Sequence, residues 1–123
     1  MRSALIFVIG LLLSTVAHAL SAEELVSKCR PYANAKVDGE KITIPGTIDT
    51  NFCWGVFTAT FNLTYLVDAD TKRRFLPVCA PTGIRQTQYI KVFLKYADDH
   101  PERLNEEYFV VLLDSLRSVW PCH

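Results

Sequence analysis

The residues best suited to chemistry in this chain are four cysteines, Cys29, Cys53, Cys79 and Cys122. Thiols form disulfides, bind metals or attack substrates as thiolates. Zinc sites usually bring their ligands in close pairs, whereas these cysteines lie far apart in the sequence and neither His100 nor His123 forms a ligand pair with any of them. We therefore expect two disulfides, and neither a metal site nor a cofactor.

A second candidate for chemistry is the run Asp98, Asp99 and His100, which offers acid and base groups. Adjacent residues at a helix end point in different directions, whereas a catalytic site needs groups that converge in space. The chain also lacks G-x-S-x-G, H-E-x-x-H and phosphate-binding glycine motifs. We therefore expect a protein that is not an enzyme.

The first residues have the layout of a secretory signal peptide. Arg2 precedes an apolar run over residues 4–13, and residues 17–19 read Ala-His-Ala, a small-x-small cleavage pattern. A membrane-spanning helix needs about 20 apolar residues, more than this run supplies. The sequence predicts a signal peptide over residues 1–19, cleavage after Ala19 and export of a single domain over residues 20–123, with no membrane attachment afterwards.

The charge balance limits the partners of the exported domain. Thirteen basic and thirteen acidic side chains give the whole chain a formal net charge of zero. Nucleic acids and anionic membranes are bound through an excess of positive charge. We therefore expect no nucleic-acid partner, and recognition by shape and local polarity.

Apolar periodicity predicts an all-α domain of four to five helices. Ser21 and Glu24 have the spacing of a capping box, so a first helix runs from Ser21 to about residue 30. Residues 31–50 are expected to form a long loop with at most one short strand. Further helices are expected over residues 51–69, over residues 84–97 with Thr82 as cap, and from residue 102 or 105 to residue 120. The last is predicted to be the most buried, and Gly55 to allow the close approach of another element.

This order of helices restricts the disulfide pairing. In an antiparallel helical hairpin, the start of one helix lies beside the end of the next. Cys29 ends one predicted helix and Cys53 opens the following one, while Cys79 precedes the third helix and Cys122 follows the fourth. Antiparallel hairpins therefore favour Cys29–Cys53 with Cys79–Cys122, and the nested pairs Cys29–Cys122 and Cys53–Cys79 remain an alternative.

Three stretches of the chain carry short motifs: residues 79–88 read CAPTGIRQTQ, residues 96–104 read YADDHPERL and residues 116–122 read LRSVWPC. In this order they resemble the C-x-P-x-G-[VI]-x-x-x-Q signature, the H-P-E-x-L segment and the terminal [FW]-P-C of the Rap/Tai immunity family. Upstream, residues 25–29 and 53–55 match its L-x-x-x-C and C-x-G, and Ser115 stands where an alanine is common. The signature positions expected to maintain the scaffold are Gly55, Pro81, Gly83, Gln88, Pro101 and Pro121.

The resemblance implies a periplasmic inhibitor. Members of that family protect bacteria from peptidoglycan amidase effectors of type VI secretion by occluding the active-site cleft, and are helical and often dimeric. Alternatives are a periplasmic disulfide-bonded acid-stress chaperone, a saposin-like lipid-binding module, or a family member without a toxin partner. A convex polar turn suits a cleft, so the residues predicted to contact the toxin are Asp98, Asp99, His100, Glu102 and Arg103. The loop over residues 36–49 ranks second.

Overall fold

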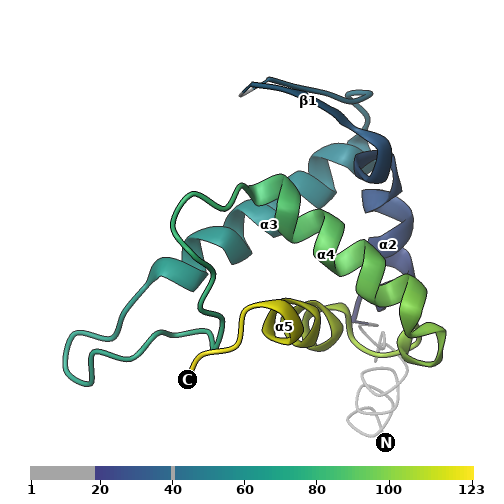
Figure 1. Ribbon diagram of the computed structural model, residues 1–123. Helices are drawn as coiled ribbons and strands as arrows, with labels where there is room; N and C mark the ends of the chain where they lie inside the picture. The colour runs from purple at the N-terminus through teal and green to yellow at the C-terminus, as the bar shows by residue number, and fades with distance from the viewer. Residues whose placement is uncertain (1–18, 40) are drawn as a thin grey trace, which may run out of the picture.

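Four α-helices form the body of the molecule in the computed structural model, which describes residues 19–39 and 41–123 (Figure 1). The first, α2 (Ala22–Cys29), starts where the sequence predicts it. The Ser21 hydroxyl accepts the Glu24 N–H at 3.2 Å, and the Glu24 carboxylate accepts the Ser21 N–H at 2.8 Å. This capping box satisfies two backbone donors that a helix start leaves without partners. The short 3₁₀ helix η1 (Arg30–Asn34) follows.

A small β-hairpin corrects the expectation of an all-α fold with a loop at residues 31–50. Strands β1 (Lys36–Asp38) and β2 (Lys41–Thr43) pair antiparallel, with Val37 opposite Ile42. Gly39 has a φ of +59°, a conformation that glycine adopts without strain and that hairpin turns require. The segment thus contains two short strands where the sequence predicts at most one. The hairpin extends away from the helices at the top of Figure 1.

Helix α3 (Ile48–Tyr65) starts three residues before its predicted beginning and ends four residues before its predicted end. Thr47 and Thr50 cap each other: each hydroxyl accepts the backbone N–H of the other residue, at 2.9 and 3.1 Å. Beyond Tyr65 the chain forms a projecting turn, in which Val67 pairs with Arg74. The predicted helix is confirmed, and the threonine cap places its start earlier than the sequence predicts.

Helices α4 (Gln86–Asp99) and α5 (Tyr108–Val119) follow, joined by the 3₁₀ helix η2 (Pro101–Arg103). Arg85, rather than Thr82, is the residue before α4, and its N–H donates to the Gln88 side chain at 2.7 Å. The Glu107 carboxylate accepts two N–H groups at the start of α5. That cap places the start of α5 later than either predicted position.

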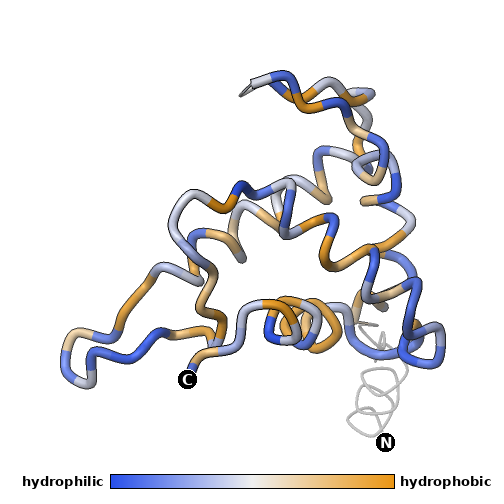
Figure 2. The backbone as a smooth tube through the Cα atoms, in the orientation of Figure 1, coloured by the Kyte–Doolittle hydropathy of each residue, from blue (hydrophilic) through white to orange (hydrophobic). Residues whose placement is uncertain are grey.

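The core lies where the four helices meet, and each of them contributes buried apolar residues; Figure 2 shows hydrophobic stretches along all four helices. Phe57 of α3 packs against Phe93 of α4, with ring centroids 5.7 Å apart. The buried Tyr89 hydroxyl lies 3.0 Å from the Thr64 hydroxyl, which satisfies both groups. The prediction that the last helix is the most buried is wrong, because α5 leaves Val110 and Val119 about half exposed while α4 contributes six buried residues.

The favoured disulfide pairing is confirmed. Cys29–Cys53 joins α2 to α3, with Cα atoms 5.2 Å apart, and Cys79–Cys122 joins the segment before α4 to the chain end, at 5.0 Å. Cys29 and Cys53 are fully buried, whereas Cys122 is exposed. One bridge thus ties α2 to α3, and the other ties the segment before α4 to the segment after α5.

Candidate functional site

The turn between α4 and α5 contains the five residues predicted to contact a toxin. Asp98 is held by Arg30 of η1, whose guanidinium donates two hydrogen bonds to the carboxylate at 3.0 and 2.8 Å. These bonds lower the pKa of Asp98 below its usual value. Asp98 is therefore an exposed anchor between two elements that are far apart in the sequence.

Arg103 lies deepest in the turn, with 19% of its side chain exposed. Its guanidinium binds the Glu106 carboxylate through two nitrogens, at 2.9 and 2.7 Å, and also donates to the Tyr96 hydroxyl at 2.8 Å. Asp114 of α5 lies 2.9 Å away on another side. The bonds from Glu106 and Tyr96 raise the pKa of Arg103. Arg103 thus fixes the turn against α4 and α5 rather than projecting from it.

The remaining three predicted residues form local pairs on the surface. Asp99 accepts from Lys95 one helical turn earlier, at 2.8 Å. His100 Nδ1 lies 3.0 Å from Glu102, and its ring packs on Tyr96 with centroids 4.3 Å apart. Hydrogen bonds from its own N–H and from His100 lower the pKa of Glu102. The structure therefore brings the five residues into one polar turn, but Asp99 and His100 each bond to a different neighbour.

The second predicted surface, residues 36–49, is fastened to the body at two points. The Arg85 guanidinium donates to the Gly39 carbonyl, and Lys28 binds Asp49 at 2.7 Å. A shallow pocket under the hairpin is lined by Val37, Ile42, Trp54, Arg85, Gln86 and Thr87.

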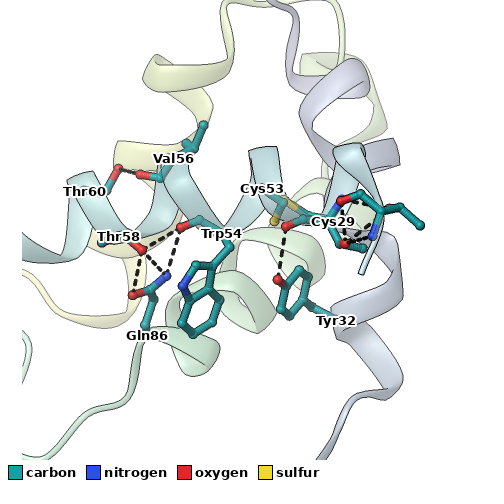
Figure 3. Close-up of a disulfide and its surroundings, with 10 residues drawn as sticks. Cys29, Tyr32, Cys53, Trp54, Val56, Thr58, Thr60 and Gln86 are labelled. Carbon is teal, nitrogen blue, oxygen red and sulfur yellow. Dashed lines mark hydrogen bonds between the residues drawn. A yellow bond between two sulfur atoms is a disulfide. The ribbon is translucent and has the colours of Figure 1, made fainter. Parts of the chain in front are cut away.

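The Arg85 and Gln86 side chains of this pocket are already paired. Figure 3 shows Gln86 bonded to the Trp54 carbonyl and to Thr58, at 3.0 and 2.9 Å, with the Trp54 ring stacked on Tyr32. Tyr32 in turn donates to the Thr50 carbonyl at 3.1 Å. The pocket is therefore a packed junction with little unpaired polarity to offer a ligand.

The signature positions lie mostly at turns and element ends. Gly83 has a φ of +89° just before α4, and Pro101 opens η2. Pro121 pairs with Val78 beside the Cys79–Cys122 disulfide. Gln88 bonds to backbone as expected, but it is exposed rather than half-buried. Pro101 thus lies in the polar turn, whereas Gly83 and Pro121 lie near the start of α4 and the end of α5, the ends of these helices that are farther from the turn.

Gly55 does not have the packing role predicted for it. It is exposed on α3, and a Cβ built there meets nothing within 4 Å. The same exposed face of α3 carries large apolar residues that the sequence reasoning missed, because only one face of the helix was sought. A second apolar repeat at helical spacing, starting at Ile48 and Phe52, is the signal that would have found them.

Residues 19–39 and 41–123 offer neither a membrane-spanning helix nor a cluster of metal ligands. In that part of the chain no helix is long and apolar enough to cross a membrane. The same residues contain no group of three or more His, Cys, Asp or Glu side chains that could hold a metal ion.

Comparison with known proteins gives one match. No curated protein and no solved structure matches the chain. The family model of the Rap1a immunity proteins matches residues 18–122, which include both disulfides, all four helices and the polar turn. A match over nearly the whole chain shows that this protein belongs to the Rap1a immunity protein family.

Proposed function

We propose that this protein is a periplasmic immunity protein that binds a peptidoglycan amidase effector of a type VI secretion system and covers its active-site cleft. The observation that carries the proposal is the family match over residues 18–122. Immunity proteins are generally non-catalytic and act by binding a cognate effector. The effector class comes from the resemblance of residues 79–88, 96–104 and 116–122 to the Rap/Tai signatures.

The two disulfides support a location outside the cytoplasm, because such bridges persist in oxidising compartments such as the periplasm. The predicted signal peptide supplies the route, and it lies outside the described residues apart from Ala19. Leu20, the first residue expected after cleavage, is anchored in the fold: its carbonyl accepts the Tyr108 N–H at 3.0 Å. Cleavage after Ala19 would therefore leave a start that is already held in place.

The proposed mechanism is occlusion, in which the protein carries out no chemical step. The turn at residues 98–103 is short and fixed by Arg30 and Arg103, so little conformational entropy is lost when a partner binds it. Asp99 and Glu102 are the exposed carboxylates of this turn whose bonds are local. We propose that they face the N–H-rich or cationic lining of the amidase cleft.

The test is binding and inhibition with the amidase effector encoded in the same genome. Protein purified from the periplasm should bind that amidase and stop its release of peptides from peptidoglycan. The Asp99→Ala, Glu102→Ala double variant should bind about tenfold or more weakly, since unpairing one buried interfacial charge costs about 2–5 kcal/mol.

Asp70→Ala removes an exposed carboxylate on the turn beyond α3, so it is the matched control and should bind normally. If the double variant still binds and fully inhibits the amidase, the contact surface lies outside the turn. Absence of any binding by the wild-type protein would contradict the proposed function itself. Suppression of aggregation of unrelated proteins at low pH, without amidase binding, would favour the acid-stress chaperone.

A further inference from the structure

A shallow groove borders the polar turn at residues 98–103. It lies between α2 on one side and the end of α4 with η2 on the other, and its volume is about 610 Å³. Helix α2 lies beside α4 in this part of the molecule (Figure 1). Asp98 and Pro101 belong both to the turn and to the lining of the groove. A partner that binds the turn therefore also meets the groove.

The two walls of the groove are held together by hydrogen bonds. The Glu23 N–H on α2 donates to the Leu104 carbonyl just after η2, at 3.0 Å. Arg30 joins Asp98 through two hydrogen bonds at 3.0 and 2.8 Å. The shape of the groove is thus set within the monomer, which limits the conformational entropy lost when a partner binds.

The floor of the groove is apolar. Val26 and Ala97 are buried, with 7% and 2% exposed, and Leu104 is half-buried and packs against the core. Pro101 adds an exposed ring at one side. Methylene groups are transferred favourably from water to such a surface. The floor therefore suits the aliphatic part of a side chain.

The charge at the rim of the groove is negative. Both terminal nitrogens of Arg30 donate to the Asp98 carboxylate, so these two charges compensate each other. The Glu23 carboxylate is exposed and bonds to no side chain in residues 19–39 and 41–123. Among the residues that line the groove, Glu23 is thus the charged group without a counter-charge.

An apolar floor that ends at a free carboxylate fits a long cationic side chain. Lysine and arginine lay their methylene groups along apolar surface while their charged ends stay at polar groups. An acidic side chain would be repelled by Glu23, and a purely apolar one would remove water from this carboxylate without replacing its hydrogen bonds. The chemistry of the groove thus selects one class of residue.

We propose that this groove binds a lysine or arginine side chain of the amidase effector, whose cationic end pairs with Glu23. The proposal rests on the proposed function and adds to it the kind of effector residue that is recognised beside the turn. Glu23 then determines specificity, because an effector with a neutral or acidic residue at this place leaves the carboxylate unpaired or repelled.

The test is the dissociation constant of the complex with the amidase effector encoded in the same genome, measured by calorimetry at low and high salt. Glu23→Gln keeps the shape of the side chain and removes its charge, so binding should weaken at least about fivefold at low salt. The difference should shrink at high salt, where charges are screened. Glu23→Lys brings like charges together and should weaken binding further, by at least about fiftyfold.

Asp70→Asn and Asp70→Lys are the matched controls, because Asp70 is an exposed carboxylate outside both the groove and the polar turn. Both variants should bind like the wild-type protein. Equal losses for the Asp70 and Glu23 variants would show that only the net charge matters and would overturn the proposal.

Ser27→Lys tests the groove from within the chain. Ser27 is an exposed lining residue one helical turn after Glu23, and a Glu–Lys pair with this spacing and order stabilises a helix. The new lysine should therefore pair with Glu23, leave α2 folded and weaken amidase binding at least about tenfold. Ser27→Ala removes only a hydroxyl and should bind like the wild-type protein.

Alanine variants of the exposed lysines and arginines of the amidase identify the bound residue. One of them should weaken binding to the wild-type protein but not to Glu23→Gln, since the pair is already broken there.

The outcomes separate this proposal from the proposed function. If the wild-type protein binds the amidase and Glu23→Gln binds as tightly, the groove does not hold a cationic side chain, while the proposed function stands. Normal binding by Glu23→Gln with weak binding by Ser27→Lys would show that an uncharged group occupies the groove. Absence of binding by the wild-type protein would overturn both proposals.

Discussion

The guanidinium of Arg30 and the carboxylate of Asp98 are joined by two hydrogen bonds, although 68 positions separate them in the sequence. The pair connects η1, directly after α2, to the last turn of α4. It lies on the surface, where ion pairs contribute about 0–1 kcal/mol. Its effect is thus to set the position of the turn more than to hold the fold together.

Asp98→Asn should remove part of the acid sensitivity of the fold. Arg30 lowers the folded-state pKa of Asp98 below its unfolded value, so the pair stabilises the protein above about pH 4 and that contribution is lost as the pH falls through the folded pKa. Urea unfolding should show wild type more stable by about 0.2–1 kcal/mol at pH 6. The difference should disappear near pH 2, and a difference that grows in acid would contradict this origin.

Arg103→Ala should destabilise the protein by about 1–3 kcal/mol, because Glu106, Asp114 and the Tyr96 hydroxyl would all lose a charged partner. The measurement is the free energy of unfolding in urea. Arg117→Ala is the matched control: its guanidinium is more exposed and lies 3.7 Å from Asp114, so its loss should change stability by less than about 0.5 kcal/mol. Equal effects of the two variants would show that the Arg103 network is not structural.

The two disulfides should differ in their resistance to reduction. Cys29–Cys53 is fully buried, whereas Cys122 is exposed at the chain end. Under native conditions dithiothreitol should therefore open Cys79–Cys122 first, as seen by alkylation and mass spectrometry, and both bridges should open together in denaturant. Loss of either bridge should cost about 3–4 kcal/mol in the chain-entropy description of loops of this size. Earlier alkylation of Cys29 and Cys53 would contradict the order.

Replacing either of two glycines by alanine should change the stability of the fold, in opposite directions. Gly83 has a φ of +89°, so Gly83→Ala forces a left-handed conformation and should destabilise by about 1–3 kcal/mol. Gly55 is helical with open space, so Gly55→Ala should stabilise by about 0.5–1 kcal/mol. Thermal unfolding of both variants at low protein concentration provides the comparison. A destabilised Gly55→Ala would mean that the glycine is required within the monomer.

What the sequence predicted well depends on local periodicity and chain order. The capping box at Ser21 fixes the start of α2, and the order of the helices favoured the Cys29–Cys53 pair that the structure contains. The β-hairpin was missed because each strand has only three residues, too few to show a clear alternation of polar and apolar positions. The pairing of Val37 with Ile42 is therefore not visible in the sequence. The start of α3 was placed late because its cap is a threonine pair, Thr47 and Thr50, rather than the usual serine and glutamate.

The predicted site shows a different limit. The five residues of the turn are neighbours in sequence, so their proximity was predictable. Their partners were not, because Arg30 and Asp114 come from elements whose packing the sequence alone does not give. The exposed apolar face of α3, which includes Ile48 and Phe52, was missed for the opposite reason. Its apolar repeat is local in the sequence. Because α3 is apolar on two sides, the repeat on the buried side masks the repeat on the exposed side.

The first residues of the domain are joined to its last third. Ala22 and Glu23 donate backbone hydrogen bonds to Glu106 and Leu104, at 2.9 and 3.0 Å, and Leu20 accepts from Tyr108. These contacts cannot form until nearly the whole chain has been synthesised, and contacts between distant residues slow folding. During synthesis, the N-terminal residues of the domain therefore have no partners to bind until residues 104–108 have been added. On the export proposed above, we expect this delay to keep the polypeptide unfolded while a translocation channel can still accept it.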